Sequence, residues 1–394
     1  MKIGIIIEEY YPALNGVSVL MKYFCDLLAV DNEVYVFCTD SHGSYTSMKD
    51  DKVVINRYSL RQNRFFLIKG DHGKFLDDII KANIDILIVT SAQCVTTNIV
   101  LKHIKQFDSK LIFYSHGFSG YKKNKFAFRL DFSENILGQL FRHFYMIYYY
   151  IIFKRKIRYF DHSIFISEYL SDYQFYSDLN IINKSVIHNF ITEEFFYDYM
   201  NDYKLPKEFD NINKYILNIS NYQNIKNQIM LLKAYYKIRD TKIDLVFIGS
   251  KETDYLQTLK NTKNSLDNKH GYKNVHFLVN IQREYFRQIY DKSEFFVLTS
   301  KIEQYPMVII ESMARKKAFI STDVGNLSYL PGGKIVRGLR ELISTIDLFC
   351  SNKNLIDKLG AEGFAYAVKN NQIKIGFSRL KYVIDSVQKN TNMP

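Results

Sequence analysis

Short apolar segments alternate along the chain with segments in which apolar residues recur at helical spacing. In the first half, strands are expected at 3–7, 34–38, 84–90 and 111–114, with a helix over 17–28. Such alternation is typical of βαβ units that build a parallel sheet. The N-terminal half is therefore predicted to be an α/β domain.

The same alternation begins again after a polar stretch from 197 to 214. Strands are then expected at 215–219, 244–249, 275–278, 295–298 and 318–322, and a helix is expected over 229–238. The predicted fold class is α/β, with two Rossmann-like doubly wound domains that face each other across a cleft.

The predicted boundaries follow the polar stretch and the helical pattern of the tail. We expect an N-terminal domain at 1–196, a linker at 197–214, a C-terminal domain at 215–375 and a helical tail at 376–394. Ligands of open α/β sheets bind beyond the carboxyl ends of the strands, so the loops after the strands are the place to look for function.

Composition and charge exclude several classes of protein. The 394 residues include 31 Tyr and 30 Phe but only 17 Gly and 5 Pro, which excludes a collagen-like or largely disordered chain. The formal net charge of +12 indicates an anionic partner such as a nucleotide, a membrane surface or a polyanion. The four cysteines have neither metal-site nor disulfide-framework spacing, which favours a reducing compartment.

Two apolar runs bear on location. The run before Glu8 is shorter than the apolar core of a signal peptide, which has about 7 to 15 residues. The longest charge-free apolar run, 144–153, has ten residues, whereas a membrane-spanning helix needs about 20. We therefore expect a cytoplasmic protein without a spanning helix.

Candidate chemistry concentrates in the loop after the expected strand 295–298. Pro306 is placed to be the first residue of a helix that continues through Glu311, and the positive end of that helix favours a phosphate group. Glu303 and Glu311 flank this anion site, and their carboxylates can accept hydrogen bonds from the hydroxyls of a sugar and of a ribose. The alternative is that both acids only complement the helix dipole.

The whole pattern is more specific than either acid. Ser300-x2-Glu303-x7-Glu311, followed by Asp323-Val-Gly325, resembles the donor-site signature of GT-B glycosyltransferases, specifically the retaining family four, or glycosyl transferases group 1. In that family the first Glu contacts donor-sugar hydroxyls, backbone amides between the two Glu meet sugar and phosphate, and the second Glu holds the ribose. The resemblance assigns these roles to Glu303, to Tyr305, Pro306 and Met307, and to Glu311.

The segment 216–228 resembles the strand, loop and helix that in this family bring an Arg and a Lys to the donor diphosphate. Lys226 matches the lysine, whereas Asn221 stands where the arginine is usual and supplies no charge. Without the downstream motif, Lys226 would be interpreted as a solvated lysine. Asn280 and Lys317 replace two further residues that are glycine in the family.

Two loops of the N-terminal half extend the resemblance. Gly16 matches a glycine at which the backbone approaches the leaving phosphate, and His116 matches a histidine that meets the donor sugar and the acceptor. A simple turn at Gly16 and a structural role for His116 remain open. His188, near the end of the N-terminal domain, is either a ligand donor or a buried structural residue. The resemblance also implies that the C-terminal helix returns to the N-terminal domain.

No Asp-x-Asp sequence occurs, and no His or Cys cluster has the spacing of metal ligands. GT-B enzymes commonly stabilise the leaving diphosphate with a lysine and a helix end, a role that Lys226 and the helix after Pro306 can take. The resemblance therefore implies that no metal and no other cofactor is required.

The segment 141–160 combines a tyrosine-rich apolar run with basic residues, among them Lys154, Arg155, Lys156 and Arg158. It fits a helix that lies on an anionic membrane surface, and it also fits a helix buried below the sheet. Nothing resembles a nucleic-acid-binding fold, so we expect no nucleic-acid partner.

Together these features predict a retaining hexosyl- or N-acetylhexosaminyltransferase. It would move a sugar from a nucleotide diphosphate to a hydroxyl of a surface glycan or lipid-linked precursor, at the inner face of the plasma membrane. The resemblance to the family alone implies UDP rather than GDP. The predicted catalytic residues are His116, Lys226 and Glu303, and the predicted donor-binding residues are Gly16, Asn221, Lys226, Tyr305, Pro306, Met307 and Glu311. The alternatives are a catalytically inactive GT-B partner or chaperone subunit, and a GT-B phosphorylase or epimerase.

Overall fold

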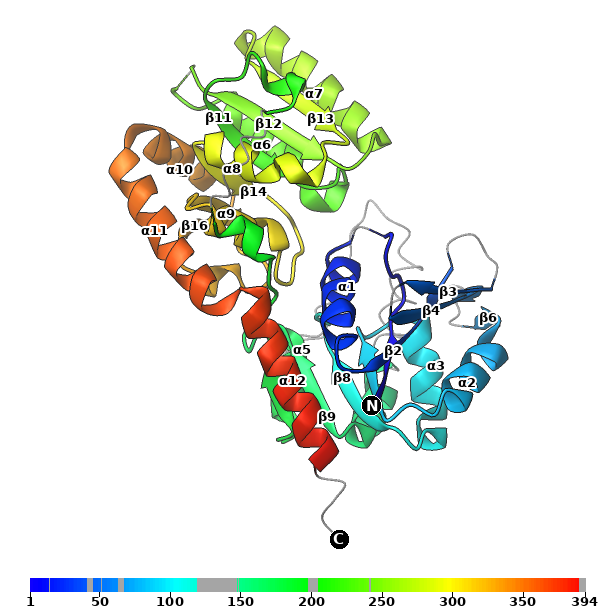
Figure 1. The fold of residues 1–394 in the computed structure, drawn as a ribbon. Helices are drawn as coiled ribbons and strands as arrows, with labels where there is room; N and C mark the ends of the chain where they lie inside the picture. The colour runs from blue at the N-terminus through cyan, green and yellow to red at the C-terminus, as the bar shows by residue number, and fades with distance from the viewer. Residues whose placement is uncertain are drawn as a thin grey trace. The chain divides into compact units, whose positions relative to one another are not determined.

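The computed structural model describes residues 1–13, 15–40, 45–50, 52–62, 67–118, 147, 149–197, 205–240 and 242–389. The chain forms two compact units (Figure 1), of which the first comprises Met1–His188 and Phe377–Pro394 and the second Asn189–Gly376. The division falls before the predicted domain end at 196, and part of the predicted linker lies outside the described residues.

The first unit is built on an eight-stranded sheet with the order β10-β9-β8-β7-β1-β2-β4-β3, in which only β3 runs antiparallel to its neighbour. The strands are β1 (Lys2–Ile6), β2 (Glu33–Thr39), β3 (Thr46–Asp50), β4 (Val53–Tyr58), β7 (Ile86–Thr90), β8 (Lys110–Tyr114), β9 (His162–Phe165) and β10 (Lys184–Val186). A separate pair is formed by β5 (Leu60–Gln62) and β6 (Ile68–Gly70).

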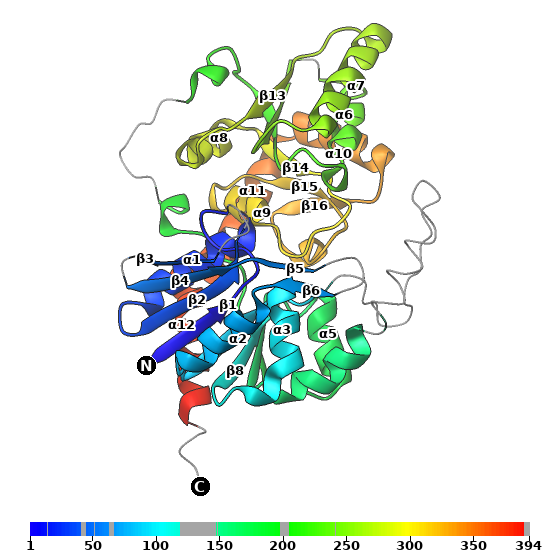
Figure 2. The same cartoon turned by 90° about the vertical axis from the view of Figure 1, so that its right-hand side faces the viewer.

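Helices pack against this sheet (Figure 2). Among them are α1 (Gly16–Leu28), α2 (His72–Lys81), α3 (Val95–His103), α5 (Ser171–Asp178) and the larger part of α12 (Ile373–Lys389). The inner strands are apolar almost throughout because both faces of a parallel sheet are covered; every residue of β7 is buried. The grouping of 377–389 with the first unit agrees with the predicted return of the C-terminal helix.

The second unit contains a six-stranded parallel sheet with the order β13-β12-β11-β14-β15-β16. Its strands are β11 (Tyr215–Ile219), β12 (Asp244–Gly249), β13 (Val275–Val279), β14 (Phe295–Leu298), β15 (Phe319–Thr322) and β16 (Gly333–Val336). Its helices are α6 (Gln228–Tyr235), α7 (Asp254–His270), α8 (Phe286–Lys292), α9 (Met307–Ala314), α10 (Leu339–Ser351) and α11 (Lys353–Asn370). Both units thus confirm the predicted α/β class with Rossmann-like sheets.

The order of the second sheet creates a switch point between β11 and β14. The chain adds β12 and β13 on one side of β11 and then returns to place β14 on the other side. At such a point the loops after the two central strands diverge and leave room for a ligand. The loops after β11 and β14 are the ones that carry Lys226 and Glu303.

The described part of the predicted basic aromatic segment is built into the first unit. Residues 149–156 are helical, and Tyr149, Tyr150 and Phe153 are buried in the core, where the rings of Phe153 and Phe113 lie 5.4 Å apart. Lys154 and Arg155 are exposed. Residues 141–146 and 148 lie outside the described residues. For the tyrosines at 149 and 150 the buried-helix interpretation is therefore the correct one.

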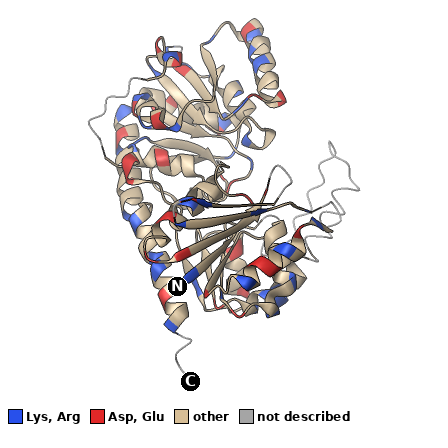
Figure 3. Cartoon of the chain, turned by 45° about the vertical axis from the view of Figure 1, so that its right-hand side comes forward, with Lys and Arg blue, Asp and Glu red and all other residues tan. Residues whose placement is uncertain are grey.

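Charge is spread over both units, with Lys and Arg interspersed among Asp and Glu (Figure 3). Within the described residues, no helix combines the length and the apolar character needed to cross a bilayer.

Candidate functional site

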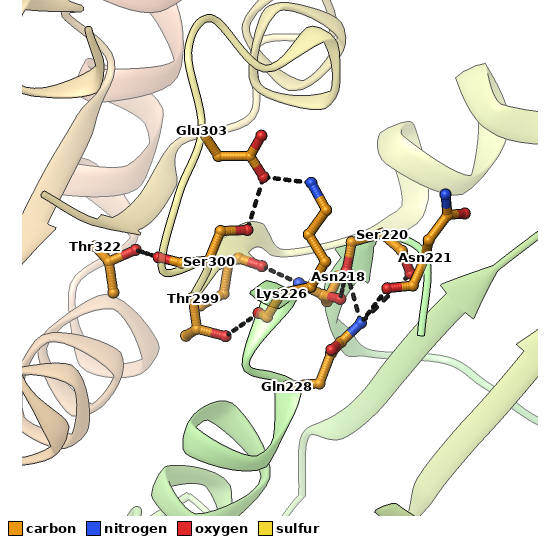
Figure 4. Close-up of polar contacts among 10 residues, drawn as sticks. Asn218, Ser220, Asn221, Lys226, Gln228, Thr299, Ser300, Glu303 and Thr322 are labelled. Carbon is orange, nitrogen blue, oxygen red and sulfur yellow. Dashed lines mark hydrogen bonds and ion pairs between the residues drawn. The ribbon is translucent and has the colours of Figure 1, made fainter. Parts of the chain in front are cut away.

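Lys226 and Glu303 meet at the switch point of the second sheet (Figure 4). Lys226 ends a short 3-10 turn after β11, and its ammonium lies 2.6 Å from Oε1 of Glu303 in the loop after β14. The hydroxyl of Ser300 donates a hydrogen bond of 2.7 Å to the same carboxylate oxygen. The Lys226 and Glu303 side chains are only 24% and 13% exposed. The structure thus brings together two predicted catalytic residues that are distant in sequence.

Backbone contacts hold the two loops together. Lys301 donates its N–H to the carbonyl of Ile225 at 2.8 Å, and the hydroxyl of Thr299 donates to the carbonyl of Asn227 at 3.0 Å. Asn227 closes the turn after Lys226 with a φ of 53°, a left-handed conformation that asparagine tolerates better than most residues. The spacing of the ammonium and the carboxylate therefore rests on the backbone as well as on the ion pair.

The end of β15 and the loop that follows it hold the loop that carries Glu303. The hydroxyl of Thr322 donates to the carbonyl of Ser300 at 2.6 Å, and the N–H of Asn326 donates to the carbonyl of Gln304 at 3.0 Å. Gly325 has a φ of +59°, and a Cβ there would lie 2.2 Å from the carbonyl oxygen of Gln304. A glycine is thus required for this close approach, which gives the Asp323-Val-Gly325 sequence a physical role.

The helix that follows the loop of Glu303, α9, begins one residue later than predicted. Pro306 is the N-cap of α9, with φ −69° and ψ 125°, and Met307 is the first helical residue. The expected placement of Pro306 inside the helix is wrong because its ψ is extended, although its carbonyl already accepts from the N–H of Ile309 at 3.2 Å.

Tyr305 is turned into the protein. Its side chain is 4% exposed, its carbonyl accepts a hydrogen bond of 2.8 Å from the amide of Asn189, and its hydroxyl lies 3.0 Å from the amide nitrogen of Asn371. These contacts fix the backbone just before α9. A ligand role for Tyr305, Pro306 and Met307 through backbone N–H groups would depend on this rigid segment; Pro306 itself has no N–H to offer.

Glu311 is the fifth residue of α9 and is 1% exposed. Its carboxylate forms an ion pair with Arg283 and accepts a hydrogen bond of 3.2 Å from the hydroxyl of Tyr290. Burial and the neighbouring carboxylate raise the pKa of Tyr290, so its hydroxyl remains a donor. The guanidinium of Arg283 thus lies against the buried carboxylate and compensates its charge.

Arg283 and Tyr290 were not predicted from the sequence. The guanidinium of Arg283 lies 5.9 Å from the ring centres of Phe195 and of Phe286, and its side chain is 51% exposed. It thus joins the buried Glu311 to the surface. The sequence offers one signal, since a buried glutamate in α9 needs a cation as a partner. Nothing in the spacing of the residues identifies Arg283 as that cation.

Asn221 is not brought to the pair of Lys226 and Glu303. It is exposed, and Figure 4 shows its side-chain amide directed away from the ammonium of Lys226. Its carbonyl accepts a hydrogen bond of 3.0 Å from the amide of Gln228, which also donates to the hydroxyl of Ser220 at 2.9 Å. Gln228, a further residue that was not predicted, holds the loop while the side chain of Asn221 remains solvated.

Gly16 and His116 belong to the first unit. Gly16 is the first residue of α1, which is capped by Asn15, whose side chain accepts from the N–H of Ser18 at 2.9 Å. His116 follows β8, and its ring stacks on that of Tyr114 with centres 4.8 Å apart.

Burial lowers the pKa of His116 to about 4, so the imidazole is neutral near neutral pH. Its Nε2 is buried and has no hydrogen-bond partner in the part of the chain that the structure describes. His188 differs in having Glu168 nearby, with Nε2 3.6 Å from a carboxylate oxygen, and its pKa is also lowered by burial.

Among the described residues, no group of three or more His, Cys, Asp and Glu side chains is arranged to hold a metal ion.

Comparison with known proteins relates one segment of the chain to a known family. Residues 202–330 match the family described as glycosyl transferases group 1, and this segment contains Lys226, Glu303 and Glu311. No curated protein matches the chain in a sequence comparison.

Solved structures show that the whole chain has the GT-B fold. Sucrose-phosphate synthase from Thermosynechococcus elongatus is 14% identical, with a TM-score of 0.72 over 98% of each chain. An E. coli trehalose-6-phosphate structure bound with UDP-2-fluoro glucose is 12% identical, with a TM-score of 0.72 over 98% of this chain and 99% of the other. Anabaena HepE, in complex with UDP and glucose, is 13% identical, with a TM-score of 0.67 over 98% of this chain and 100% of the other.

Proposed function

We propose that this protein is a retaining glycosyltransferase that moves a hexosyl or N-acetylhexosaminyl group from a UDP-sugar to a hydroxyl of a surface glycan or lipid-linked precursor. The observation that carries the proposal is the pair of Lys226 and Glu303 at the carboxyl ends of β11 and β14. The group 1 segment and the UDP-bound structures of the same fold support it.

The charges of Lys226 and Glu303 complement the two parts of a nucleotide sugar, the diphosphate and the sugar. Lys226 supplies the positive charge that a leaving diphosphate needs, and the first N–H groups of α9 add the positive end of a helix dipole. The carboxylate of Glu303 can accept hydrogen bonds from sugar hydroxyls, and that of Glu311 from the ribose. The neutral imidazole of His116 can exchange hydrogen bonds with the donor sugar or the acceptor without adding charge.

Retention follows from attack on the same face as departure. The leaving phosphate oxygen takes the proton of the acceptor hydroxyl while the new glycosidic bond forms, so no separate general base is needed. Lys226 then stabilises the nucleotide diphosphate that departs. Under this proposal the reaction requires no bound metal, because a fixed ammonium and a helix end do the work of a divalent ion.

The test is an assay of the purified protein with a panel of UDP and GDP sugars. Release of nucleotide diphosphate is measured with and without an extract that contains acceptors. We expect release from at least one UDP-sugar, with a marked increase when acceptor is present. No release from any donor under either condition would contradict the proposal.

The second candidate is a catalytically inactive GT-B partner or chaperone subunit. It is favoured by one observation, the solvated neutral Asn221 at the position where the family has an arginine. The same experiment separates the candidates if binding is measured alongside turnover. UDP binding by calorimetry without turnover of any donor would favour the inactive partner.

We also propose that the protein works at the inner face of the plasma membrane, held there by Lys154, Arg155, Lys156 and Arg158. Since the described tyrosines of this helix are buried, the attraction would be electrostatic, at about 1 kcal/mol for each basic residue near an anionic surface.

Reversal of all four charges to Glu should weaken binding to anionic vesicles by roughly 10³-fold in a sedimentation assay at low salt. Wild-type binding should fall as salt rises, because exposed charges are screened beyond about 8 Å at physiological ionic strength. Vesicles of neutral lipid are the control. Equal sedimentation of wild type and variant with anionic vesicles would exclude this docking site.

A further inference from the structure

The loop of residues 115–118, which follows β8, is tied down on both sides of His116. Ser115 donates its N–H to the carbonyl of Ile164 at 2.8 Å, which extends the pairing of β8 with β9 by one residue. On the other side, the N–H of Gly117 donates to the hydroxyl oxygen of Ser115 at 3.3 Å. Gly117 has a φ of 103°, which a side chain would strain.

The hydroxyl of Ser115 leads to a buried carboxylate. It donates a hydrogen bond of 2.5 Å to Oδ2 of Asp172, in the first turn of α5, while Oδ1 of Asp172 accepts from the N–H of Tyr173 at 3.0 Å. Both Asp172 and Ser115 are 0% exposed. A buried carboxylate is costly unless hydrogen bonds compensate it, so this arrangement is stable in only a few geometries.

The residue before Asp172 adds a further contact to the same loop. The hydroxyl of Ser171 donates to the carbonyl of Phe118 at 3.3 Å, and Phe118 is 2% exposed among aromatic core residues. The start of α5 therefore reaches Ser115 and Phe118 directly, and Gly117 through the Ser115 hydroxyl. His116 is the residue enclosed between them, and its buried Nε2 has no partner in the described residues.

We propose that Asp172 is a positioning residue for His116, acting through the hydroxyl of Ser115. By holding the backbone before and after His116, it fixes the imidazole against the ring of Tyr114 and keeps Nε2 in one orientation for a substrate hydroxyl. The inference rests on the proposed function, in which His116 contacts the donor sugar or the acceptor. Asp172 itself touches no substrate.

The alternative is a carboxylate that only stabilises the start of α5. The two roles make different demands on the variant Asp172→Asn, which keeps the size of the side chain and removes one of its two acceptor atoms. A helix-stabilising role predicts a loss of stability alone. A positioning role predicts a lower kcat and an altered environment of the His116 ring in a protein that remains folded.

The experiment compares Asp172→Asn with Asp178→Asn, a control at the exposed end of the same helix. For each variant, unfolding by heat, UDP affinity by calorimetry, kcat and KM with the active donor, and the NMR resonances of the His116 ring are measured. We expect Asp172→Asn to lower kcat by about 10-fold to 10²-fold, the scale for a displaced catalytic group, with unchanged UDP affinity. The His116 resonances should shift, and the control should behave as wild type.

A folded Asp172→Asn protein with wild-type kcat, or with unmoved His116 resonances, would overturn the inference. Should that variant fail to fold, Ser115→Ala removes the linking hydroxyl alone and is held to the same outcomes. If the wild type transfers no sugar, the proposed function fails, and the resonances of His116 in the variants still decide whether Asp172 positions it.

Discussion

The loops that carry the candidate catalytic residues differ between the two units. In the second unit, Lys226 has the carboxylate of Glu303 at ion-pair distance, and three loops are joined by hydrogen bonds around the pair. In the first unit, His116 is partly buried and its Nε2 is fully buried, no ion pair with it is found among the described residues, and desolvation lowers its pKa. The comparison shows that loops of the same kind, each following a parallel strand, can hold either a compensated charge pair or an uncharged polar atom.

The largest loss of turnover is expected when the carboxylate of the Lys226–Glu303 pair is removed. Glu303→Gln keeps the size of the side chain but removes the charge that pairs with Lys226 and binds sugar hydroxyls. Turnover should fall by roughly 10²-fold or more, with unchanged thermal unfolding. Glu362→Gln, on the exposed surface of α11, is the matched control. Wild-type turnover of Glu303→Gln would remove this residue from the reaction.

Loss of the lysine should be almost as severe. Lys226→Ala removes the cation that pairs with Glu303, and Asn221, which is neutral and solvated, supplies no charge in its place, so kcat should drop by about 10²-fold. Since Lys226 and Glu303 act as one pair, the double variant should lose less than the product of the single losses. Lys233→Ala, exposed on α6, is the control.

The wild-type enzyme should keep its activity in EDTA, because Lys226 and the start of α9 are proposed to replace a divalent ion. Turnover that disappears on chelation and returns with Mg²⁺ would contradict the metal-free mechanism, whatever the outcome for Lys226→Ala.

A smaller effect is expected at Glu311, which is already engaged by Arg283 and Tyr290. Glu311→Ala should weaken UDP binding by about 1.5 to 3 kcal/mol, the value of a hydrogen bond to a charged group, and should affect KM more than kcat. Calorimetry with UDP measures this directly. An unchanged affinity would mean that Glu311 serves only to anchor Arg283.

The smallest effect on kcat is expected from the titration of His116. With its pKa at about 4, the imidazole is neutral throughout the range from pH 5.5 to 8, so its titration should cause no inflection in kcat there. NMR titration of the ring checks the value. Protonation near pH 6.5 instead would show that the ring is more solvated than the structure has it.

The same shift has a consequence for stability. The unfolded chain takes up a proton at His116 below about pH 6.5, whereas the folded protein does so only near pH 4. The contribution of His116 is therefore complete above pH 6.5 and is lost as the pH falls towards 4. His116→Gln should lose less stability over that interval than the wild type, as measured by urea unfolding.

The sequence was most informative where burial is continuous. Inner strands such as β7 and β11 are buried along their whole length, are mostly apolar and were predicted. The exposed edge strand β3 was not predicted, because its sequence is mostly polar. Asn280, for which the resemblance led us to expect glycine, adopts a φ of 56°, a left-handed conformation that asparagine tolerates better than most residues.

Within the candidate site, Lys226 and Glu303 could be predicted because their motif is local to two loops. Arg283 and Asp172 could not, because each is defined by a partner far away in sequence; Asp172 and Ser115 are 57 residues apart. A periodic pattern reports which face of an element is buried. It does not report which polar group meets another inside.

The path of α12 has a consequence for dividing the protein. The helix begins in the second unit, and its residues Leu380, Val383, Ile384 and Val387 are buried within the first. A gene fragment that ends at His188 would lack these side chains and expose the apolar surface that they cover. We therefore expect the first unit to fold alone only as a circular permutant or as two complementing pieces. In the second design, a peptide that begins at Phe377 supplies the helix that covers its core.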